Sequence, residues 1–338
     1  MPNSPLDVLA PSTDEPAPQL VTRATKLVTR ELGDVEVELK RLLHSSVAVI
    51  PNVGAHLADA GGKRFRPLVT LLSARAAGFE GPERIIVAAV SELLHTATLL
   101  HDDVIDGGDV RRGRPAARLQ YGNGMAVLTG DYCLARGLQA MAATGNLAAV
   151  QSMSDTVTAM AEGEVAQLDI AGDWSLDRKR YYSVIERKTA TLIAWSCAVA
   201  NLVEPHYRHP LHRFGLEIGF AFQIADDVID YQSSESTSGK PRGQDLREGK
   251  ITLPLIIACE RDLGMRARLQ SAFSDGPPDE EELACLVEDV AHSEAAEHAL
   301  DVAASHARQA EVELRALPSS PARDALASLA RAVVRRNR

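Results

Sequence analysis

The sequence is poor in aromatic residues, which make up 4% of its 338 residues, and in cysteine, which occurs four times. Scarce aromatics among abundant Ala, Leu, Val, Glu and Arg favour helices over sheets. The cysteines form no CxxC pair and three lie in apolar helical stretches, so we expect buried thiols in a reducing compartment. An excess of positive charge is also lacking, and the formal net charge of −10 argues against an extended nucleic-acid-binding surface.

Long apolar runs and a secretory leader are missing as well. No run approaches the ~18 consecutive apolar residues of a membrane-spanning helix, so we expect no transmembrane segment. The first residues, MPNSPLDVLAPSTDEPAPQL, contain acids and prolines instead of a basic stretch followed by an apolar one. The basic end VVRRNR allows at most a peripheral membrane contact, and a solvated helix end is the simpler interpretation. We therefore expect a cytoplasmic enzyme or binding protein.

Prolines and helical periodicity divide the chain into two parts. Five prolines within residues 1–19 predict a disordered N-terminal lead. Residues 20–338 show apolar side chains at helical spacing, without strand pairs or a repeat period, and predict a single all-α domain. One polar loop, near residues 232–250, is longer than a purely structural connection usually is.

The pentapeptide DDVID occurs twice, at residues 102–106 and 226–230, each time in an apolar helical stretch. Residues i and i+4 share a helix face, so the first and last aspartates of each motif are neighbours. Like charges at this spacing destabilise a helix unless a cation neutralises them. Carboxylate oxygens suit Mg²⁺, whose coordination is usually completed by substrate phosphates. A solvated acidic face is the alternative for one such motif, and the repetition favours a metal site.

Basic side chains flank both acidic motifs, as a diphosphate site requires. The segments GGKRFRP, VRRGRP, ERKTAT, SGKPRG and LREGK contribute Lys63, Arg64, Arg66, Arg111, Arg112, Lys188, Lys240 and Lys250. Arginine forks bind phosphate oxygens in pairs, and lysine acts as a point charge. Each one alone is more simply a surface charge, but together they predict a diphosphate-binding site. His95, two turns before Asp102 on one face, and Gln223, three residues before Asp226, are candidates for substrate contacts.

Taken together, these motifs resemble those of the trans-isoprenyl diphosphate synthases, the polyprenyl synthetase family. The family's motifs are matched in order and spacing, over about residues 55–258, by GGKRFRP, LLHDDVIDGGDVRRGRP, GDYCLARG, ERKTAT and FQIADDVIDYQ followed by GKPRGQDLREGKITLP. The resemblance implies an all-α fold, an isoprenoid-synthase-type helical bundle around a deep central cavity, usually a homodimer. It also implies a Mg²⁺-dependent prenyltransferase that joins isopentenyl diphosphate to an allylic prenyl diphosphate.

The resemblance implies a role for each matching residue. Isopentenyl diphosphate would be held by Lys63, Arg66, His95 and Arg112. The allylic diphosphate would be held by Arg111, Lys188, Lys240 and Lys250. Up to three Mg²⁺ ions, replaceable by Mn²⁺, would be bound, two by Asp102 and Asp106 and a third by Asp226. The other aspartates of the motifs would act through water or orient their neighbours, namely Asp103, Asp227 and Asp230. Catalytic contacts beside the developing carbocation are implied for Lys188, Thr189 and Gln223.

The residues before the first acidic motif bear on product length. Ala97 and Thr98 lie about one helical turn, ~5.4 Å, before Asp102, and small side chains there leave the floor of a cavity open. Leu94, Ser91 and residues 131–145 are further candidates for the floor, although close helix packing explains Ala97 equally well. The stretch HTATLLHDDVID resembles long-chain synthases, so we expect a product of about seven to ten isoprene units (about C35–C50) for quinone side chains.

Three other functions stay open at the level of the sequence. A short-chain synthase making geranylgeranyl or farnesyl diphosphate would share the same motifs. A non-catalytic partner subunit usually loses acidic motifs, and both are intact here. A class I terpene cyclase generally lacks the paired GGKRFRP and RRGRP segments because it binds no second diphosphate. The intact motif set favours the synthases over the last two.

Overall fold

The computed structural model of the chain describes residues 16–58, 64–111, 113–232, 242–274, 276 and 278–335. The α-helices are α1 (Ala17–Lys26), α2 (Thr29–Leu43), α3 (Val49–Ala58), α4 (Phe65–Ala76), α5 (Glu83–Ile105), α6 (Ala117–Tyr121), α7 (Asn123–Ala143), α8 (Leu147–Asp169), α9 (Arg178–Ile185), α10 (Thr191–Cys197), α11 (Pro205–Gln232), α13 (Gln244–Arg247), α14 (Leu253–Arg261), α15 (Leu263–Ala272), α16 (Glu280–His292), α17 (Ala295–Glu313) and α18 (Pro321–Val334). A π-helical turn, η1 (Glu186–Ala190), joins α9 to α10, and two 3₁₀ turns are η2 (Val199–Asn201) and η3 (Leu314–Ala316). The expectation of an all-α fold is confirmed.

Local sequence signals set several helix ends. The Asn146 side chain accepts a hydrogen bond from the backbone N of Ala149 at 3.1 Å and begins α8. Gly78 and Gly145 adopt positive φ angles just after α4 and α7, a conformation that glycine tolerates at a helix end. These signals explain why α8 begins and why α4 and α7 end where they do.

A short strand pair corrects the expectation that the chain forms no strands. Strands β1 (Val110–Arg111) and β2 (Arg114–Pro115) pair antiparallel. Gly113 lies between them at a φ of 74°, which favours glycine. Two residues per strand are too few to show a period-2 pattern in the sequence. The hairpin places Arg111 beside the end of α5.

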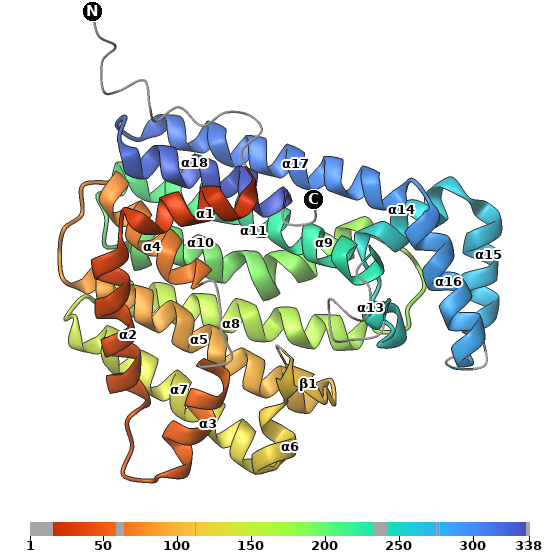
Figure 1. Ribbon diagram of the computed structural model, residues 1–338, viewed down its shortest axis with the longest axis horizontal. Coiled ribbons are helices and arrows are strands. Elements are labelled where there is room, and N and C mark those ends of the chain that lie inside the picture. The colour runs from red at the N-terminus through yellow and green to blue at the C-terminus, as the bar shows by residue number, and fades with distance from the viewer. Residues whose placement is uncertain are drawn as a thin grey trace, which may run out of the picture.

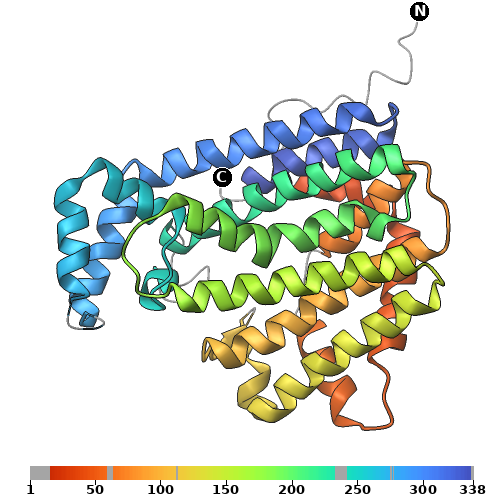
Figure 2. The same ribbon diagram turned by 180° about the vertical axis from the view of Figure 1, so that it is seen from behind.

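The helices pack in layers (Figure 1). Helices α1, α17 and α18 cover one side, α10 and α11 lie beneath them, and α5, α7 and α8 form the opposite side, as both views show (Figures 1 and 2). Helices α14, α15 and α16 gather at one end of the bundle beside α13 (Figure 1). The motif-bearing helix α11 therefore lies between α17 and α10, and α5 packs against α7, α4 and α2.

Apolar packing fixes these two helices. Leu93 and Leu94 of α5 and Phe214 of α11 are fully buried in one apolar cluster, and Tyr231 of α11 is fully buried in a second. Burial of each such side chain stabilises the fold by roughly 1.5–3 kcal/mol. The carboxylates near the ends of α5 and α11 are thus carried by rigid elements.

Two glycines let α11 approach its neighbours closely. A Cβ at Gly215 would lie 2.4 Å from Ala194 Cα, and one at Gly219 would lie 2.5 Å from Ala190 Cα. Any larger residue would push α11 away from η1 and α10, because both contacts are with backbone atoms. This close approach brings Gln223, one turn further along α11, to Thr189 of η1.

The N-terminal boundary lies slightly earlier than expected. Helix α1 begins at Ala17, within the last three residues of the lead that we expected to be disordered. Ala17 and Leu20 pack against Ala332 of α18 in a small apolar cluster. Residues 1–15 lie outside the described residues, so the disordered lead and the single domain over residues 20–338 stay predictions.

Two further expectations concern membranes and thiols. Helix α5 is long and apolar enough to cross a membrane by length and composition alone, but 61% of its most apolar window is buried inside the protein. This degree of burial is typical of a core helix of a soluble fold. The first acidic motif lies at the end of this helix. Cys133, Cys197 and Cys259 are buried free thiols, as expected, whereas the free Cys285 is exposed.

Candidate active site

The two acidic motifs meet at one cavity. Asp102 and Asp106, at the end of α5, and Asp227 and Asp230, near the end of α11, all line a polar cavity of about 270 Å³. We call this space the polar cavity. The structure thus brings together carboxylates that lie more than one hundred positions apart in the chain.

A larger, more apolar cavity adjoins the polar one. Its volume is about 560 Å³, and its apolar lining includes Leu94, Leu99, Leu134, Val157, Met160, Leu192 and Phe222. We call it the apolar cavity. The residues that line both cavities are Asp102, Arg111, Lys188, Thr189 and Gln223. Charged and apolar parts of one ligand can therefore occupy adjoining spaces with reactive groups at their boundary.

Asp102 is protonated more readily than an ordinary aspartate, because its pKa is raised to about 6. Burial is the largest cause, the charge of Lys188 opposes it, and the charges of Glu164 and Asp106 add to it. The boundary thus concentrates negative charge in a place with little solvent. Such a setting favours the binding of a cation.

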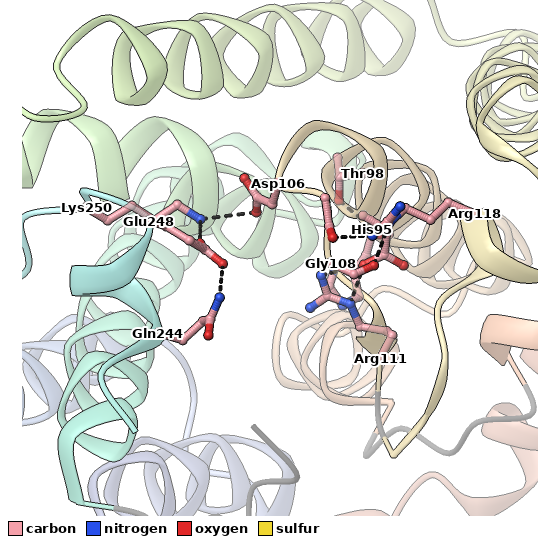
Figure 3. Close-up of polar contacts among 11 residues, drawn as sticks. His95, Thr98, Asp106, Gly108, Arg111, Arg118, Gln244, Glu248 and Lys250 are labelled. Atoms are coloured by element: carbon pink, nitrogen blue, oxygen red, sulfur yellow. Dashed lines mark hydrogen bonds and ion pairs between the residues drawn. The ribbon is translucent and has the colours of Figure 1, made fainter. Parts of the chain in front are cut away.

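The second aspartate of the first motif anchors an arginine. Asp103 is fully buried, and its Oδ1 accepts from Arg111 Nε at 2.8 Å and lies 2.7 Å from Arg111 Nη2. Within the described part of the chain, Asp103 Oδ2 has no hydrogen-bond partner. The pair fixes the Arg111 guanidinium where it lines both cavities (Figure 3).

A lysine that follows the second motif reaches the first. Lys250 Nζ donates to Asp106 Oδ2 at 3.1 Å and to Glu248 Oε2 at 2.5 Å (Figure 3). Burial by itself would lower the pKa of Lys250, but the carboxylates of Glu248, Asp106 and Asp245 together raise it above its ordinary value. The ammonium therefore stays charged beside Asp106.

The last aspartate of the second motif holds the segment that carries Lys250. Asp230 accepts hydrogen bonds from the backbone N of Gln244 at 3.1 Å and of Asp245 at 3.0 Å, at the start of α13. Its own carbonyl accepts from the backbone N of Gly243 at 2.9 Å. The second acidic motif thereby positions Lys250, whose ammonium reaches Asp106 of the first motif.

A chain of hydrogen bonds links α9, α11 and η1. Tyr181 Oη donates to Asp227 Oδ2 at 2.6 Å, and Gln223 Nε2 donates to Asp227 Oδ1 at 2.8 Å. Thr189 Oγ1 donates to Gln223 Oε1 at 2.8 Å. Burial raises the pKa of Asp227 to about 7, and the two donated hydrogen bonds oppose the shift. The chain fixes the Gln223 amide and the Thr189 hydroxyl at the boundary.

Lys188 and Thr189 lie on the π-helical turn η1, within the part of the chain predicted to be helical. Such turns within helices occur frequently at functional sites. Lys188 Nζ lies 2.6 Å from Glu164 Oε2 and donates to Gln167 Oε1 at 2.7 Å. Both partners come from α8, so this helix holds the lysine from the opposite wall.

The remaining predicted site residues divide into four groups. Arg64 lines neither cavity and instead donates to Glu36 Oε1 at 2.6 Å and to Glu92 Oε1 at 3.1 Å. Arg66, His95 and Asp226 line the apolar cavity. Lys63, Arg112 and Lys240 lie outside the described residues, so their predicted roles stay untested. Of the candidates for the cavity floor, Leu94, Thr98 and Leu134 line the apolar cavity, whereas Ala97 and Ser91 are fully buried in the core.

Four residues at the site were missed by the sequence analysis, namely Glu164, Gln167, Tyr181 and Glu248. Glu164 and Gln167 are three positions apart in EGEVAQLD and share a helix face, which was an available signal. Tyr181 and Glu248 gave no comparable signal, because their partners Asp227 and Lys250 come from elsewhere in the chain.

The donor set fits a hard divalent cation. Asp102, Asp106 and Asp226 offer carboxylate oxygens from two helices, and the Lys250 ammonium shows that positive charge is favoured beside Asp106. Within the described part of the chain, no three His, Cys, Asp or Glu side chains form a complete metal site. Carboxylate oxygens suit Mg²⁺, which usually takes further ligands from water and substrate phosphates.

The chain is similar to known proteins in both sequence and structure. Residues 47–290 match the polyprenyl synthetase family. Octaprenyl diphosphate synthase of Escherichia coli (strain K12) is 35% identical over 319 residues, covering 94% of this chain and 99% of that protein. A polyprenyl synthase from Caulobacter crescentus CB15, solved with calcium and isoprenyl diphosphate, has a TM-score of 0.90 at 37% identity, covering 94% of this chain and 98% of that one. Decaprenyl diphosphate synthase from Rhodobacter capsulatus has a TM-score of 0.87 at 36% identity, covering 94% and 99%.

The fold and the paired cavities define an isoprenoid-synthase-type prenyltransferase. The chain belongs to the polyprenyl synthetase family, whose members are metal-dependent and act on isoprenyl diphosphates. The fold class and the enzyme class expected from the sequence are therefore confirmed.

Proposed function

We propose that this prenyltransferase catalyses the Mg²⁺-dependent, sequential condensation of isopentenyl diphosphate with an allylic prenyl diphosphate to give a long-chain trans-polyprenyl diphosphate. The observation that carries the proposal is the boundary where Asp102, Lys188 and Gln223 separate the polar cavity from the apolar one. The similarity to octaprenyl and decaprenyl diphosphate synthases supports the long-chain synthesis expected from the sequence. A length of about seven to ten isoprene units stays a proposal.

The allylic diphosphate occupies the polar cavity in this proposal. Arg111, Lys188 and Lys250 line that cavity and supply the cations that its oxygens need. Lys240, which lies outside the described residues, joins them on the strength of the resemblance.

Isopentenyl diphosphate lies on the other side of the boundary. Arg66 and His95 line the apolar cavity, where they meet its diphosphate. Lys63 and Arg112 complete this set on the strength of the resemblance alone. The two diphosphates are thus held by separate groups of cations that face the same boundary.

Up to three Mg²⁺ ions, or Mn²⁺ in their place, would be held by Asp102, Asp106 and Asp226. When bound, they supply positive charge that stabilises the pyrophosphate as it departs. Asp103 acts indirectly, because it holds Arg111. Asp230 also acts indirectly, because it holds the start of α13.

The chemistry at the boundary follows from charge. Breaking the allylic carbon–oxygen bond leaves a carbocation beside the Gln223 amide and the Thr189 hydroxyl, whose oxygen dipoles stabilise positive charge. The isopentenyl double bond attacks this cation, and the proton released passes to the pyrophosphate. The apolar side chains beyond the boundary exclude the water that would quench the cation. Each cycle adds one isoprene unit.

The growing chain extends into the apolar cavity, away from the diphosphate. Thr98 leaves this space open one turn from Asp102, and Leu94 and Leu134 form its wall further on. The open space at Thr98 supports a long product.

We propose that the protein is a homodimer and acts in the cytoplasm. Its product would supply the side chains of quinones. Large apolar side chains are exposed on α7 and α8, including Leu128, Leu147 and Val165. Exposed apolar surface on adjacent helices marks an interaction face. Sedimentation equilibrium tests the dimer, and a monomer at micromolar concentration would exclude it.

The function is tested by incubating the purified protein with isopentenyl diphosphate, each allylic starter and Mg²⁺, followed by sizing of the products. We expect trans-polyprenyl diphosphates of about seven to ten isoprene units. A sole C15 or C20 product would replace the long-chain proposal with a short-chain one. Product formation without isopentenyl diphosphate would indicate a cyclase.

A further inference from the structure

Glu164 is a carboxylate at the reaction boundary to which neither the motifs nor their resemblance gives a role. It lies on α8, lines the apolar cavity, and its side chain is 16% exposed. We propose that Glu164 is a positioning residue, which holds the Lys188 ammonium between the two cavities by pairing with it in place of Asp102. This inference rests on the proposed function, in which Lys188 binds the allylic diphosphate.

Glu164 and Gln167 together direct the ammonium of Lys188. An ammonium has three N–H donors. One points at Glu164 Oε2, 2.6 Å away, and another at Gln167 Oε1, 2.7 Å away. Because Gln167 lines the polar cavity and Glu164 the apolar one, the two acceptors straddle the boundary. The remaining donor is left to meet a diphosphate oxygen.

The close approach of α8 to η1 is built into the backbone. A Cβ at Gly163 would lie 2.7 Å from Arg187 Cβ and 2.8 Å from the backbone N of Lys188. Glycine at this position lets α8 touch the π-helical turn, and the next residue, Glu164, lies within 2.6 Å of the Lys188 ammonium. The pair is therefore a fixed feature of the fold instead of a surface contact between flexible side chains.

If Glu164 were removed, Lys188 could pair with another carboxylate, that of Asp102. Lys188 and Asp102 line the same two cavities, and a lysine side chain is flexible enough to pair with either acid. Pairing with Asp102 would occupy a carboxylate that the site needs for a cation. Glu164 supplies an alternative partner, which keeps Asp102 available and the ammonium pointed at the diphosphate.

The test substitutes Glu164→Gln, which keeps the shape and removes the charge. We expect the KM of the allylic diphosphate to rise about tenfold, because a charge-assisted hydrogen bond is lost, while the KM of isopentenyl diphosphate changes less than twofold. Calorimetric binding of farnesyl diphosphate with Mg²⁺, in the absence of isopentenyl diphosphate, should weaken by the same factor. A purely structural role would change both KM values together.

A double-mutant cycle shows whether Glu164 acts through Lys188. In a Lys188→Met background, Glu164→Gln should change allylic binding less than twofold, whereas additive effects would overturn the proposal. The control is Glu162→Gln on the same helix, whose 60% exposed carboxylate lies 4.0 Å from Arg187 and should leave both KM values unchanged. If Glu164→Gln does not fold, Glu164→Asp, which withdraws the carboxylate by one methylene, must show the same selective loss.

The outcomes separate this inference from the proposed function. A wild-type protein that forms no prenyl product refutes the proposed function. An active wild type whose Glu164→Gln variant behaves like the Glu162→Gln control refutes the positioning role alone.

Discussion

Lys250 and Asp106 form an ion pair of 3.1 Å between positions 144 residues apart, which joins the loop after the second acidic motif to the end of the first. The side chains are 15% and 16% exposed, so the pair lies largely out of water. It shows where the site favours positive charge. It also ties the two motif-bearing halves of the cavity together without a metal ion.

The first prediction is that Lys250→Met destabilises the metal-free protein. Asp106 and Glu248 would be left unpaired, at a cost of about 2 kcal/mol in the free energy of unfolding. Added Mg²⁺ should restore more stability to the variant than to the wild type, because the ion replaces the missing charge. Urea unfolding with EDTA or with Mg²⁺ measures both effects. The control is Lys179→Met, a change at an exposed lysine. An equal effect of Mg²⁺ on the stability of the wild type and of both variants would contradict the prediction.

The second prediction concerns the carboxylates proposed to hold the ions. Asp102→Ala and Asp226→Ala should each abolish turnover, by about a thousandfold or more, because the departing pyrophosphate loses its stabilising charge. The helical content measured by circular dichroism should stay that of the wild type. Near-normal activity in either variant would refute the metal assignment.

The third prediction follows from the pKa of Asp102, which is about 6 in the folded protein against an ordinary value of 3.8. Between these values the folded state binds more protons than the unfolded state, so the free energy of unfolding falls as pH rises. The stabilisation is complete below about pH 4 and lost above about pH 6 to 7. Asp227, with its pKa raised to about 7, acts in the same direction.

This pH dependence is measured by urea unfolding in EDTA. The metal-free wild type should lose stability between about pH 5 and pH 8, and Asp102→Asn should lose less over the same range. The difference between the two proteins isolates Asp102 from other titrating groups. Parallel curves for both proteins would show that Asp102 has an ordinary pKa.

The fourth prediction tests the hydrogen-bond chain that ends at Thr189. Tyr181→Phe removes the 2.6 Å hydrogen bond to Asp227 and should lower kcat about tenfold, since Gln223 loses its fixed orientation. Tyr182→Phe is a matched control one residue away, because its hydroxyl lies 3.5 Å from His306 Nε2, outside the site. Equal rates for the two variants would show that the chain does not orient Gln223.

The fifth prediction separates two neighbouring positions on α5. Thr98→Phe should shorten the product, because Thr98 lines the apolar cavity, and Thr98→Val should leave the product length unchanged. Ala97→Phe should instead destabilise the fold by about 1–3 kcal/mol or more, because Ala97 is fully buried. Product sizing and thermal unfolding distinguish these outcomes. An unchanged product from Thr98→Phe would place the floor of the cavity elsewhere.

Much of the fold and part of the site were accessible from the sequence. Helical periodicity predicted the all-α fold, because this signal acts between residues close in the chain. The i, i+4 spacing of each acidic motif also depends only on helix geometry. The short β1–β2 pair and the π-helical turn η1 escaped prediction, because neither has a sequence period of its own.

By itself, then, the sequence determined the helices, the two acidic faces and the supply of cations around them. Tertiary structure alone decided which charges meet: that Lys250 pairs with Asp106, that Tyr181 supports Asp227, and that Glu164 holds Lys188. It also decided that Thr98 lines a cavity while Ala97 is buried in the core. The physical reason is distance. Local spacing fixes the direction of a side chain on its own helix, but its partner depends on how closely another helix packs, as the glycines at 163, 215 and 219 show.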